Sequence, residues 1–352
     1  MAPFTGTDIY KMILGPSGRV AYALNLATHR IFQYRIATDG RLLPLSTPSV
    51  VTKEGVRDFV LTSDGRFGYM SDASDETISQ YQVSPSGMLT PLTPATAPVE
   101  AKPRVLCIHP DGRTLYAANQ RDHNISQFRI TPGGQLISLG PPVPSSGEPT
   151  GFTFAPDHHA LYVCNWSPGS VSQYRINTDG RLTPLAPAQV LEGGAASAGL
   201  VLAPAVRSAY VTNAGGQIFQ YRINADDSLS SLVPASLPTG GSSEKLVITP
   251  LGRFVYVSNY GGESISQYKV NTDGTLIALS PRDVDAHPMP EPLAMDPSGR
   301  FVYTINDSKS GVSRISQFRI SATGQLVPLT PATVPAGPGS GLLTITNLPE
   351  KK

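Results

Sequence analysis

The residues that could do chemistry stand where a repeated sequence unit departs from its own pattern. When the repeats are aligned on a recurring turn, the residue nine places before the turn arginine enters each expected inner strand. In chain order these positions hold Tyr10, Arg57, Arg104, Thr150, Ala198, Glu244 and Glu291. The two arginines could bind a carboxylate or phosphate and stabilise charge on a carbonyl oxygen. Either glutamate could activate water if crowding of the two carboxylates raises one pKa.

The same charges have a second interpretation, because ion pairs between them would simply solvate a water-filled channel. Asp58, Lys102, Glu148 and Lys245 are close to these positions in the sequence and could serve either purpose. We therefore keep Lys102 and Glu148 as candidate ligand-binding residues, and both interpretations remain open.

Three further side chains belong to connections between the expected strands. His287 is part of the irregular segment RDVDAHPMPEP. It could act as an acid or base at the channel mouth, or be an exposed loop residue. Trp166 and Tyr260 directly follow a recurring asparagine, in YVCNW and YVSNY. Both could stack on a ring-shaped ligand such as a sugar or lactone, or cap the edge of a sheet.

A unit of about 47 residues carries all of these positions and occurs seven times. The string IFQYRI at Ile31 recurs as ISQYQV, ISQFRI, VSQYRI, IFQYRI, ISQYKV and ISQFRI. A second string precedes each of these and reads YALN, YMSD, YAAN, YVCN, YVTN, YVSN and YTIN. We interpret the repeated asparagines and the repeated Gln-Tyr pairs as structural, because one function at seven places is improbable.

Each unit contains four short apolar runs rich in Val, Ile, Tyr and Phe, which are separated by turns such as SDGR and NTDG. Asp-Gly between apolar runs supplies the positive φ of tight hairpins, so each unit predicts four antiparallel strands. Seven such units predict an all-β, seven-bladed β-propeller whose first strands line a central channel. The blades begin near residues 10, 57, 104, 150, 198, 244 and 291 of a single domain, 1–352. A surplus strand at 342–346 is expected to close the first or last blade.

The strings YVTN, PSGR and PDGR, with SQYRI and TDGRLTPL, resemble the YVTN-repeat and lactonase-type seven-bladed propellers. That group contains 6-phosphogluconolactonase and carboxymuconate lactonising enzymes, and the resemblance covers essentially the whole chain. Members carry His-Pro-Arg-His or His-Pro-His before the first strand of a blade. The nearest match here is Lys102-Pro103-Arg104, so Arg104 alone corresponds. The resemblance implies metal-free hydrolysis of a lactone on a small anionic molecule. A non-catalytic propeller that binds a ligand or a protein is the alternative.

Composition narrows the possible partners. The 352 residues are 40% hydrophobic, with 27 basic and 26 acidic residues and no block of Lys or Arg, which argues against nucleic acid and anionic membranes. No apolar run reaches the roughly 18 residues of a membrane helix. No pair of histidines has ligand spacing with a carboxylate, so neither a metal nor another cofactor is expected. We expect a monomer.

The N-terminal segment MAPFTGTDIYK has neither the basic region nor the apolar region of a signal peptide. A chain that begins at a mature terminus would look the same, and we favour a location outside the cytoplasm after removal of such a signal. Cys107 and Cys164 occupy different positions of their repeats within apolar runs. They are expected to be two buried free thiols.

Overall fold

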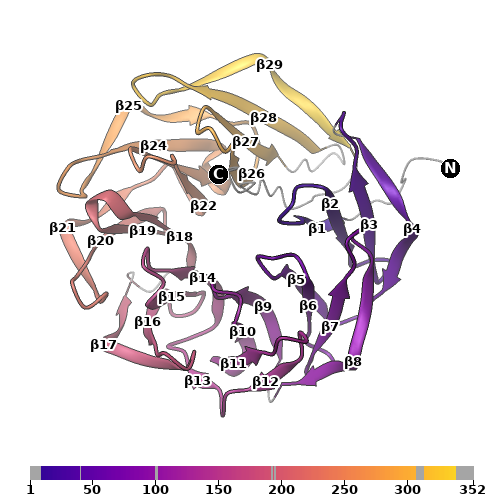
Figure 1. Cartoon of the computed structure of the whole chain (residues 1–352). Helices are drawn as coiled ribbons and strands as arrows, with labels where there is room; N and C mark the ends of the chain where they lie inside the picture. The colour runs from indigo at the N-terminus through magenta and orange to yellow at the C-terminus, as the bar shows by residue number, and fades with distance from the viewer. Residues whose placement is uncertain are drawn as a thin grey trace. The chain divides into compact units, whose positions relative to one another are not determined.

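The computed structural model describes residues 9–39, 41–99, 102–191, 193, 196–306 and 313–337. Within these residues the regular structure consists of β-strands and three short 3₁₀ helices, and the strands form seven antiparallel sheets (Figure 1). The predicted closing strand at 342–346 lies outside the described residues.

The described chain divides into two compact units. Unit 1 contains the described residues up to Thr150 together with Ile176–Thr183. Unit 2 contains Gly151–Arg175 and the described residues from Pro184 onward. The two arginines that the repeat singles out belong to unit 1, and the two glutamates belong to unit 2.

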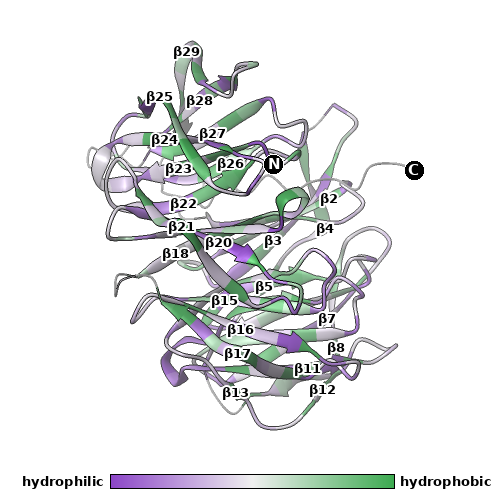
Figure 2. Cartoon of the chain, turned by 90° about the vertical axis from the view of Figure 1, so that its left-hand side faces the viewer, coloured by the Kyte–Doolittle hydropathy of each residue, from purple (hydrophilic) through white to green (hydrophobic). Residues whose placement is uncertain are grey.

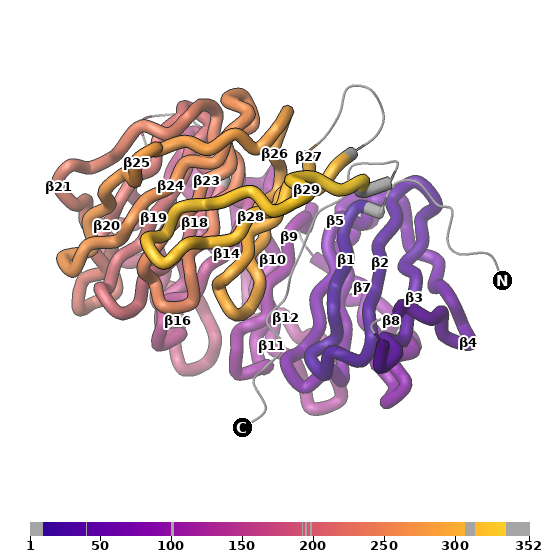
Figure 3. The backbone as a smooth tube through the Cα atoms, turned by 90° about the horizontal axis from the view of Figure 1, so that it is seen from above, coloured from indigo at the N-terminus to yellow at the C-terminus, as the bar shows by residue number. Residues whose placement is uncertain are grey.

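The first three sheets belong to unit 1, and their strands are paired antiparallel in chain order, except for the last strand of the third sheet (Figure 3). The first contains β1 (Ile9–Leu14), β2 (Val20–Asn25), β3 (Arg30–Ile36) and β4 (Leu42–Val51). The second contains β5 (Val56–Leu61), β6 (Phe67–Asp72), β7 (Thr77–Val83) and β8 (Leu89–Pro98). The third contains β9 (Pro103–Ile108), β10 (Thr114–Asn119), β11 (Asn124–Ile130), β12 (Leu136–Ser138) and β13 (Val143–Pro144), with the helix η1 (Gln120–Asp122) before β11.

The other four sheets follow the same plan. The fourth contains β14 (Pro149–Phe154), β15 (Ala160–Asn165), β16 (Ser170–Ile176) and β17 (Leu182–Leu191). The fifth contains β18 (Ser197–Ala203), the helix η2 (Pro204–Val206), β19 (Ser208–Asn213), β20 (Gln217–Ile223) and β21 (Leu229–Pro238). The sixth contains β22 (Ser243–Ile248), β23 (Phe254–Asn259), the helix η3 (Tyr260–Gly262), β24 (Ser264–Val270) and β25 (Leu276–Asp285). The seventh contains β26 (Pro290–Met295), β27 (Phe301–Asn306), β28 (Ser313–Ile320) and β29 (Leu326–Gly337).

Burial explains why each unit of sequence forms a blade. In most blades the second strand is buried along its whole length, as in β6 and β10, whereas the fourth strand is exposed at most of its positions, as in β8. A strand that packs against neighbouring sheets on both faces needs apolar residues at successive positions. In Figure 2 the strands accordingly carry most of the apolar residues.

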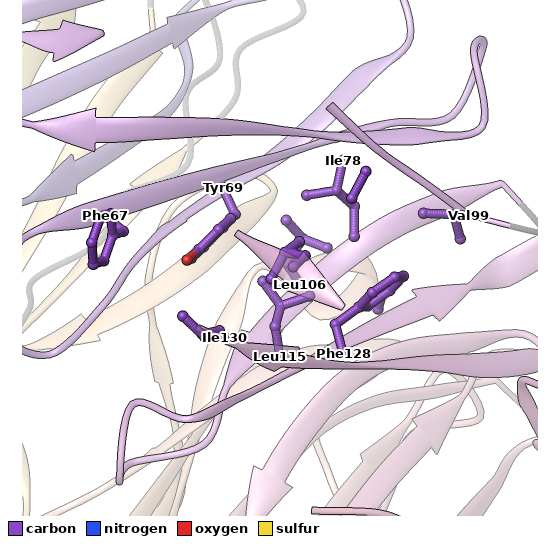
Figure 4. Close-up of a cluster of buried hydrophobic side chains, with 11 residues drawn as sticks. Phe67, Tyr69, Ile78, Val99, Leu106, Leu115, Phe128 and Ile130 are labelled. Carbon is purple, nitrogen blue, oxygen red and sulfur yellow. The ribbon is translucent and has the colours of Figure 1, made fainter. Parts of the chain in front are cut away.

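Most of the apolar clusters join neighbouring blades, although one lies within the first sheet. Figure 4 shows one of them, in which side chains of the second sheet meet side chains of the third. The second sheet contributes Phe67, Tyr69 and Ile78, and the third contributes Leu106, Leu115, Phe128 and Ile130. Each blade is therefore stabilised mainly by its neighbours, as expected of a radial repeat.

A repeated tyrosine of the second strand and the repeated glutamine of the third strand join successive blades, which confirms that the glutamine is structural. The hydroxyl of Tyr22 donates to the carbonyl of Gly87 at 2.7 Å, and five later tyrosines do the same. Those five are Tyr69, Tyr116, Tyr162, Tyr210 and Tyr256. The carbonyl oxygen of the Gln33 side chain accepts from the N–H of Leu89 on the next blade at 2.7 Å. The same bond is made by Gln80, Gln127, Gln173, Gln220 and Gln267.

The fold is therefore the predicted all-β, seven-bladed β-propeller. One blade departs from the four-strand pattern, because the segment Leu139–Pro142 interrupts the outer strand of the third sheet, and β12 and β13 both pair with β11. No helix in the described residues is long and apolar enough to cross a membrane. Both cysteines are free, as predicted, but only Cys164 is buried, whereas Cys107 is partly buried. Burial of its thiol raises the pKa of Cys107 to about 12.

Candidate functional site

A cavity of about 420 Å³ in unit 1 is lined by four basic side chains, and we call it the cationic pocket. The connections that lead into the inner strands β5 and β9, with the first residues of those strands, contribute Gly55, Arg57, Lys102 and Arg104. The connections that leave β6 and β10 contribute Ala73, Ser74, Gln120 and Arg121. Sequence reasoning placed a site at these two kinds of connection, and the structure brings Arg57, Lys102 and Arg104 together there.

The pocket is positive because its basic groups are not neutralised. None of Arg57, Lys102, Arg104 and Arg121 forms an ion pair with a carboxylate among the described residues. No aspartate or glutamate of the described chain lines the pocket either. Guanidinium groups present several N–H donors in a planar fork that matches a carboxylate or a phosphate. An anion is therefore the natural occupant.

The inner strands that carry the two arginines are held together by Asp58 and Ser71. Asp58 is 5% exposed, and its Oδ2 accepts the backbone N–H of Leu106 on β9 at 2.8 Å. Its own N–H donates to Oγ of Ser71 at 2.9 Å, and that hydroxyl donates to the carbonyl oxygen of Arg104 at 3.2 Å. Lys11 of β1 forms an ion pair with Asp58. These bonds set β9 beside β5 and so fix where Arg104 lies relative to Arg57.

Gln120 connects the pocket to a carboxylate outside it. Nη1 of Arg104 donates to Oε1 of Gln120, and Nε2 of Gln120 donates to Oε2 of Glu148 at 3.2 Å. Glu148, predicted as a ligand-binding residue, thus contacts a pocket residue and does not line the cavity.

The sequence analysis missed Gln120 and Arg121. Gln120 directly follows the motif residue Asn119, and Trp166 and Tyr260 were singled out for the same place in their own repeats. The position directly after the recurring asparagine could therefore have identified Gln120 as well. Arg121 lies in η1, where nothing in the repeat distinguishes it.

Unit 2 carries the two predicted carboxylates at the same position of the repeat. Glu244 lies on β22 and Glu291 on β26, which are neighbouring inner strands. Burial raises the pKa of the half-buried Glu244, the negative charge of Glu291 raises it further, and the positive charge of Lys245 opposes both. A carboxyl group with a raised pKa is a better proton acceptor than an ordinary one.

The remaining predicted residues of unit 2 lie in connections. His287 is exposed with a left-handed φ of 65°, and its backbone N–H donates to Oδ1 of Asp285 at 2.9 Å. Trp166 follows β15 and is 44% exposed, whereas Tyr260 begins η3 and is partly buried. Within the described residues no hydrogen bond or ion pair is formed by these three side chains, and their predicted roles stay predictions. Among the described residues, no group of three or more His, Cys, Asp or Glu could hold a metal ion.

Similar solved structures share the fold. A Bacteroides fragilis protein named as a candidate 6-phosphogluconolactonase is 20% identical, with a TM-score of 0.67 over 94% of each chain. The periplasmic gluconolactonase of Pseudomonas aeruginosa is 21% identical, with a TM-score of 0.65 over 88% of this chain and 93% of that one. Hydrazine synthase of Kuenenia stuttgartiensis is 16% identical, with a TM-score of 0.61 over 91% and 99%. One architecture thus carries differently named activities.

No match was found among curated proteins. The sequence does match the family model described as "Lactonase, 7-bladed beta-propeller" over residues 12–140 and 184–282. These ranges include Arg57, Lys102 and Arg104 as well as Glu244. Together with the seven four-stranded repeats, this match shows that the chain belongs to the seven-bladed lactonase β-propeller family.

Proposed function

We propose that this protein hydrolyses a lactone on a small anionic molecule, and that the cationic pocket holds the negative charge of the substrate. The observation that carries the proposal is the set of four basic side chains around one cavity, without a carboxylate among the described lining residues. Membership of the lactonase family supports the reaction type. Two of the solved structures with the same fold are named for gluconolactone chemistry, which agrees with a sugar-derived lactone.

The reaction adds water across the ring ester. A base takes one proton from water as its oxygen bonds to the carbonyl carbon, and a tetrahedral intermediate with a negative oxygen forms. The ring C–O bond then breaks, and the departing oxygen takes up a proton to give the open hydroxy acid. Arg57 and Arg104 suit the charged steps, because their N–H donors can stabilise both the anionic group of the substrate and the developing oxyanion.

The sequence predicts a base in Glu244 or Glu291 of unit 2, and this prediction is tested separately from the cationic pocket, first at Glu244. Its pKa is raised, so its carboxylate is more basic than that of an ordinary exposed glutamate. Glu244→Gln should lower kcat for lactone hydrolysis by about 100-fold or more, within the range that general-base catalysis supplies. Glu291→Gln should retain most of the activity, because it removes a neighbouring charge and leaves the base in place. Equal kcat values for Glu244→Gln and the wild type would exclude this role.

Turnover of a panel of lactones tests the proposal directly. The panel should include neutral, carboxylated and phosphorylated sugar lactones, assayed with the wild type and with Arg104→Ala. We expect hydrolysis of the anionic members and a fall in kcat/KM of about 100-fold in the variant. Arg129→Ala is the matched control, since Arg129 is an exposed arginine of the same blade on β11. Absence of turnover with every lactone, or equal rates for Arg104→Ala and wild type, would reject the proposal.

A non-catalytic anion-binding propeller is the second candidate. The observation that favours it is the segment Lys102-Pro103-Arg104-Val105, which lacks the histidines expected before an inner strand from the family resemblance. The same panel separates the two candidates. Binding of a lactone acid or of sulfate with no turnover of any lactone would support the binding function and reject the hydrolase.

A further inference from the structure

We propose that Glu148 and Gln120 form a positioning relay, which fixes the guanidinium group of Arg104 in the cationic pocket without neutralising it. The proposal rests on the anion-binding role of this pocket and deepens it. Gln120 is thereby a positioning residue that sets the charge selectivity of the site.

The polarity of the contacts supports the relay. Oε1 of Gln120 accepts a hydrogen bond from Nη1 of Arg104, and Nε2 donates to Oε2 of Glu148 at 3.2 Å. An amide has one acceptor end and one donor end, so binding at both ends determines which way it faces. Gln120 and Glu148 are both partly buried, whereas Arg104 is exposed, so the relay ties an exposed guanidinium group to two side chains that are more covered.

A neutral amide at this place preserves the positive charge of the pocket. A carboxylate in contact with Arg104 would form an ion pair and compete with an incoming anion for the same N–H donors. The amide uses one donor, Nη1, and brings no negative charge into the cavity. The relay thus fixes the position of the Arg104 side chain as an ion pair would, while the guanidinium charge stays available to a ligand.

Asp122, a second carboxylate near the pocket, also accepts a hydrogen bond from a neutral N–H group. Oδ2 of Asp122 accepts the backbone N–H of Lys102 at 3.0 Å, and the ammonium group of Lys102 forms no ion pair among the described residues. Glu148 and Asp122 both accept from neutral N–H groups. Two independent contacts therefore keep nearby carboxylates away from the basic groups that line the cavity.

Sulfate binding measured by calorimetry provides the test, because sulfate keeps its charge of two across the neutral pH range. Gln120→Glu should weaken sulfate binding at least 10-fold, since it places a carboxylate beside Arg104. Gln120→Ala keeps the charge and removes the support, so its affinity should fall about 3-fold. Glu148→Gln retains an acceptor for Nε2 of Gln120 and should bind sulfate as tightly as wild type or more tightly.

Gln82→Glu is the matched control, because Gln82 is an exposed residue of β7 in the same unit and the substitution adds the same charge. It should leave sulfate affinity unchanged within 2-fold. Thermal unfolding of all variants distinguishes loss of the relay from loss of the fold, since the relay predicts altered affinity at an unchanged Tm. Where a lactone is turned over, Gln120→Glu should raise KM more than it lowers kcat.

The outcomes separate the relay from the proposed function. Wild type that binds sulfate, together with Gln120→Glu and Gln120→Ala that bind it equally well, would overturn the relay and leave the anion pocket standing. Wild type that binds neither sulfate nor an anionic lactone would overturn the pocket and the relay together. A loss of affinity in Gln82→Glu as large as in Gln120→Glu would also overturn the relay, because net charge alone would then explain the effect.

Discussion

The two units carry opposite charges at the same position of the repeat, and the groups that surround those charges differ between the units. In unit 1, Arg57 and Arg104 line a cavity with two further basic groups, and the nearby carboxylates accept from neutral donors. In unit 2, Glu244 is half-buried and faces the charge of Glu291, which raises its pKa. The strands beneath are the same in both units. The comparison shows that the first residues of an inner strand can be basic or acidic on the same four-strand framework, so this position can change without a change of fold.

Charge reversal in unit 1 should have the largest effect, because it makes that entrance resemble the one in unit 2. We expect Arg104→Glu to lower the affinity for sulfate by 100-fold or more, since it removes charge-assisted hydrogen bonds and adds repulsion. Arg129→Glu, on the exposed part of β11, makes the same change of charge and should have little effect. Calorimetry with sulfate measures both. A comparable loss in the two variants would show that the pocket attracts anions only through the net charge of the protein.

The partly buried ion pair between Lys11 and Asp58 of unit 1 is the next target, since the residue of unit 2 that corresponds to Asp58 is Lys245. Asp58→Ala removes the partner of Lys11 together with the acceptor for the N–H of Leu106. The cost should be about 3 kcal/mol in the free energy of unfolding, because an unpaired charge and a buried donor are left behind. Urea unfolding measures this loss. Asp39→Ala breaks an exposed pair with Arg41 and should cost well under 1 kcal/mol; a similar cost for both would contradict the structural role of Asp58.

The tyrosine bonds between blades should be worth the same in both units. Tyr116→Phe in unit 1 and Tyr210→Phe in unit 2 each remove one buried hydroxyl and leave a carbonyl oxygen without that donor. We expect each to lower the free energy of unfolding by about 1–2 kcal/mol. Tyr10→Phe, at a tyrosine that is 38% exposed, is the control in urea unfolding. A large effect in one unit and none in the other would show that the repeat is not energetically uniform.

These expectations also show what the sequence could and could not predict. The repeat predicted the strands, the turns and the structural role of the glutamines, because each depends on patterns that recur seven times. It also located Arg57 and Arg104, since they break the pattern. It did not predict which of the neighbouring carboxylates stay out of the pocket. That outcome depends on side-chain contacts between connections of different blades, as between Gln120 and Glu148, and sequence spacing does not determine such contacts.

The interruption of the third outer strand had a similar cause. The segment Leu139–Pro142 contains Gly140 and two prolines, and the seven-fold repeat gave no reason to expect a break there. Because Pro lacks a backbone N–H and Gly weakens a strand, the pairing with β11 stops after β12 and resumes at β13. Composition alone does not tell a break within a strand from the end of one.

The smallest expected effect concerns the pH dependence that Glu244 confers on unit 2. A raised pKa means that the folded protein binds more protons than the unfolded chain at pH values between the ordinary value of 4.5 and the raised one. Stability should therefore fall as the pH rises through that interval, and Glu244→Gln should flatten this part of the profile. Glu291→Gln should flatten it less, because burial, the larger cause of the shift, remains. Thermal unfolding between pH 4 and pH 7 measures the slopes. A profile for Glu244→Gln as steep as that of wild type would show that the crowding of these two carboxylates has no energetic consequence, and the contrast between the two units would then rest on the cationic pocket alone.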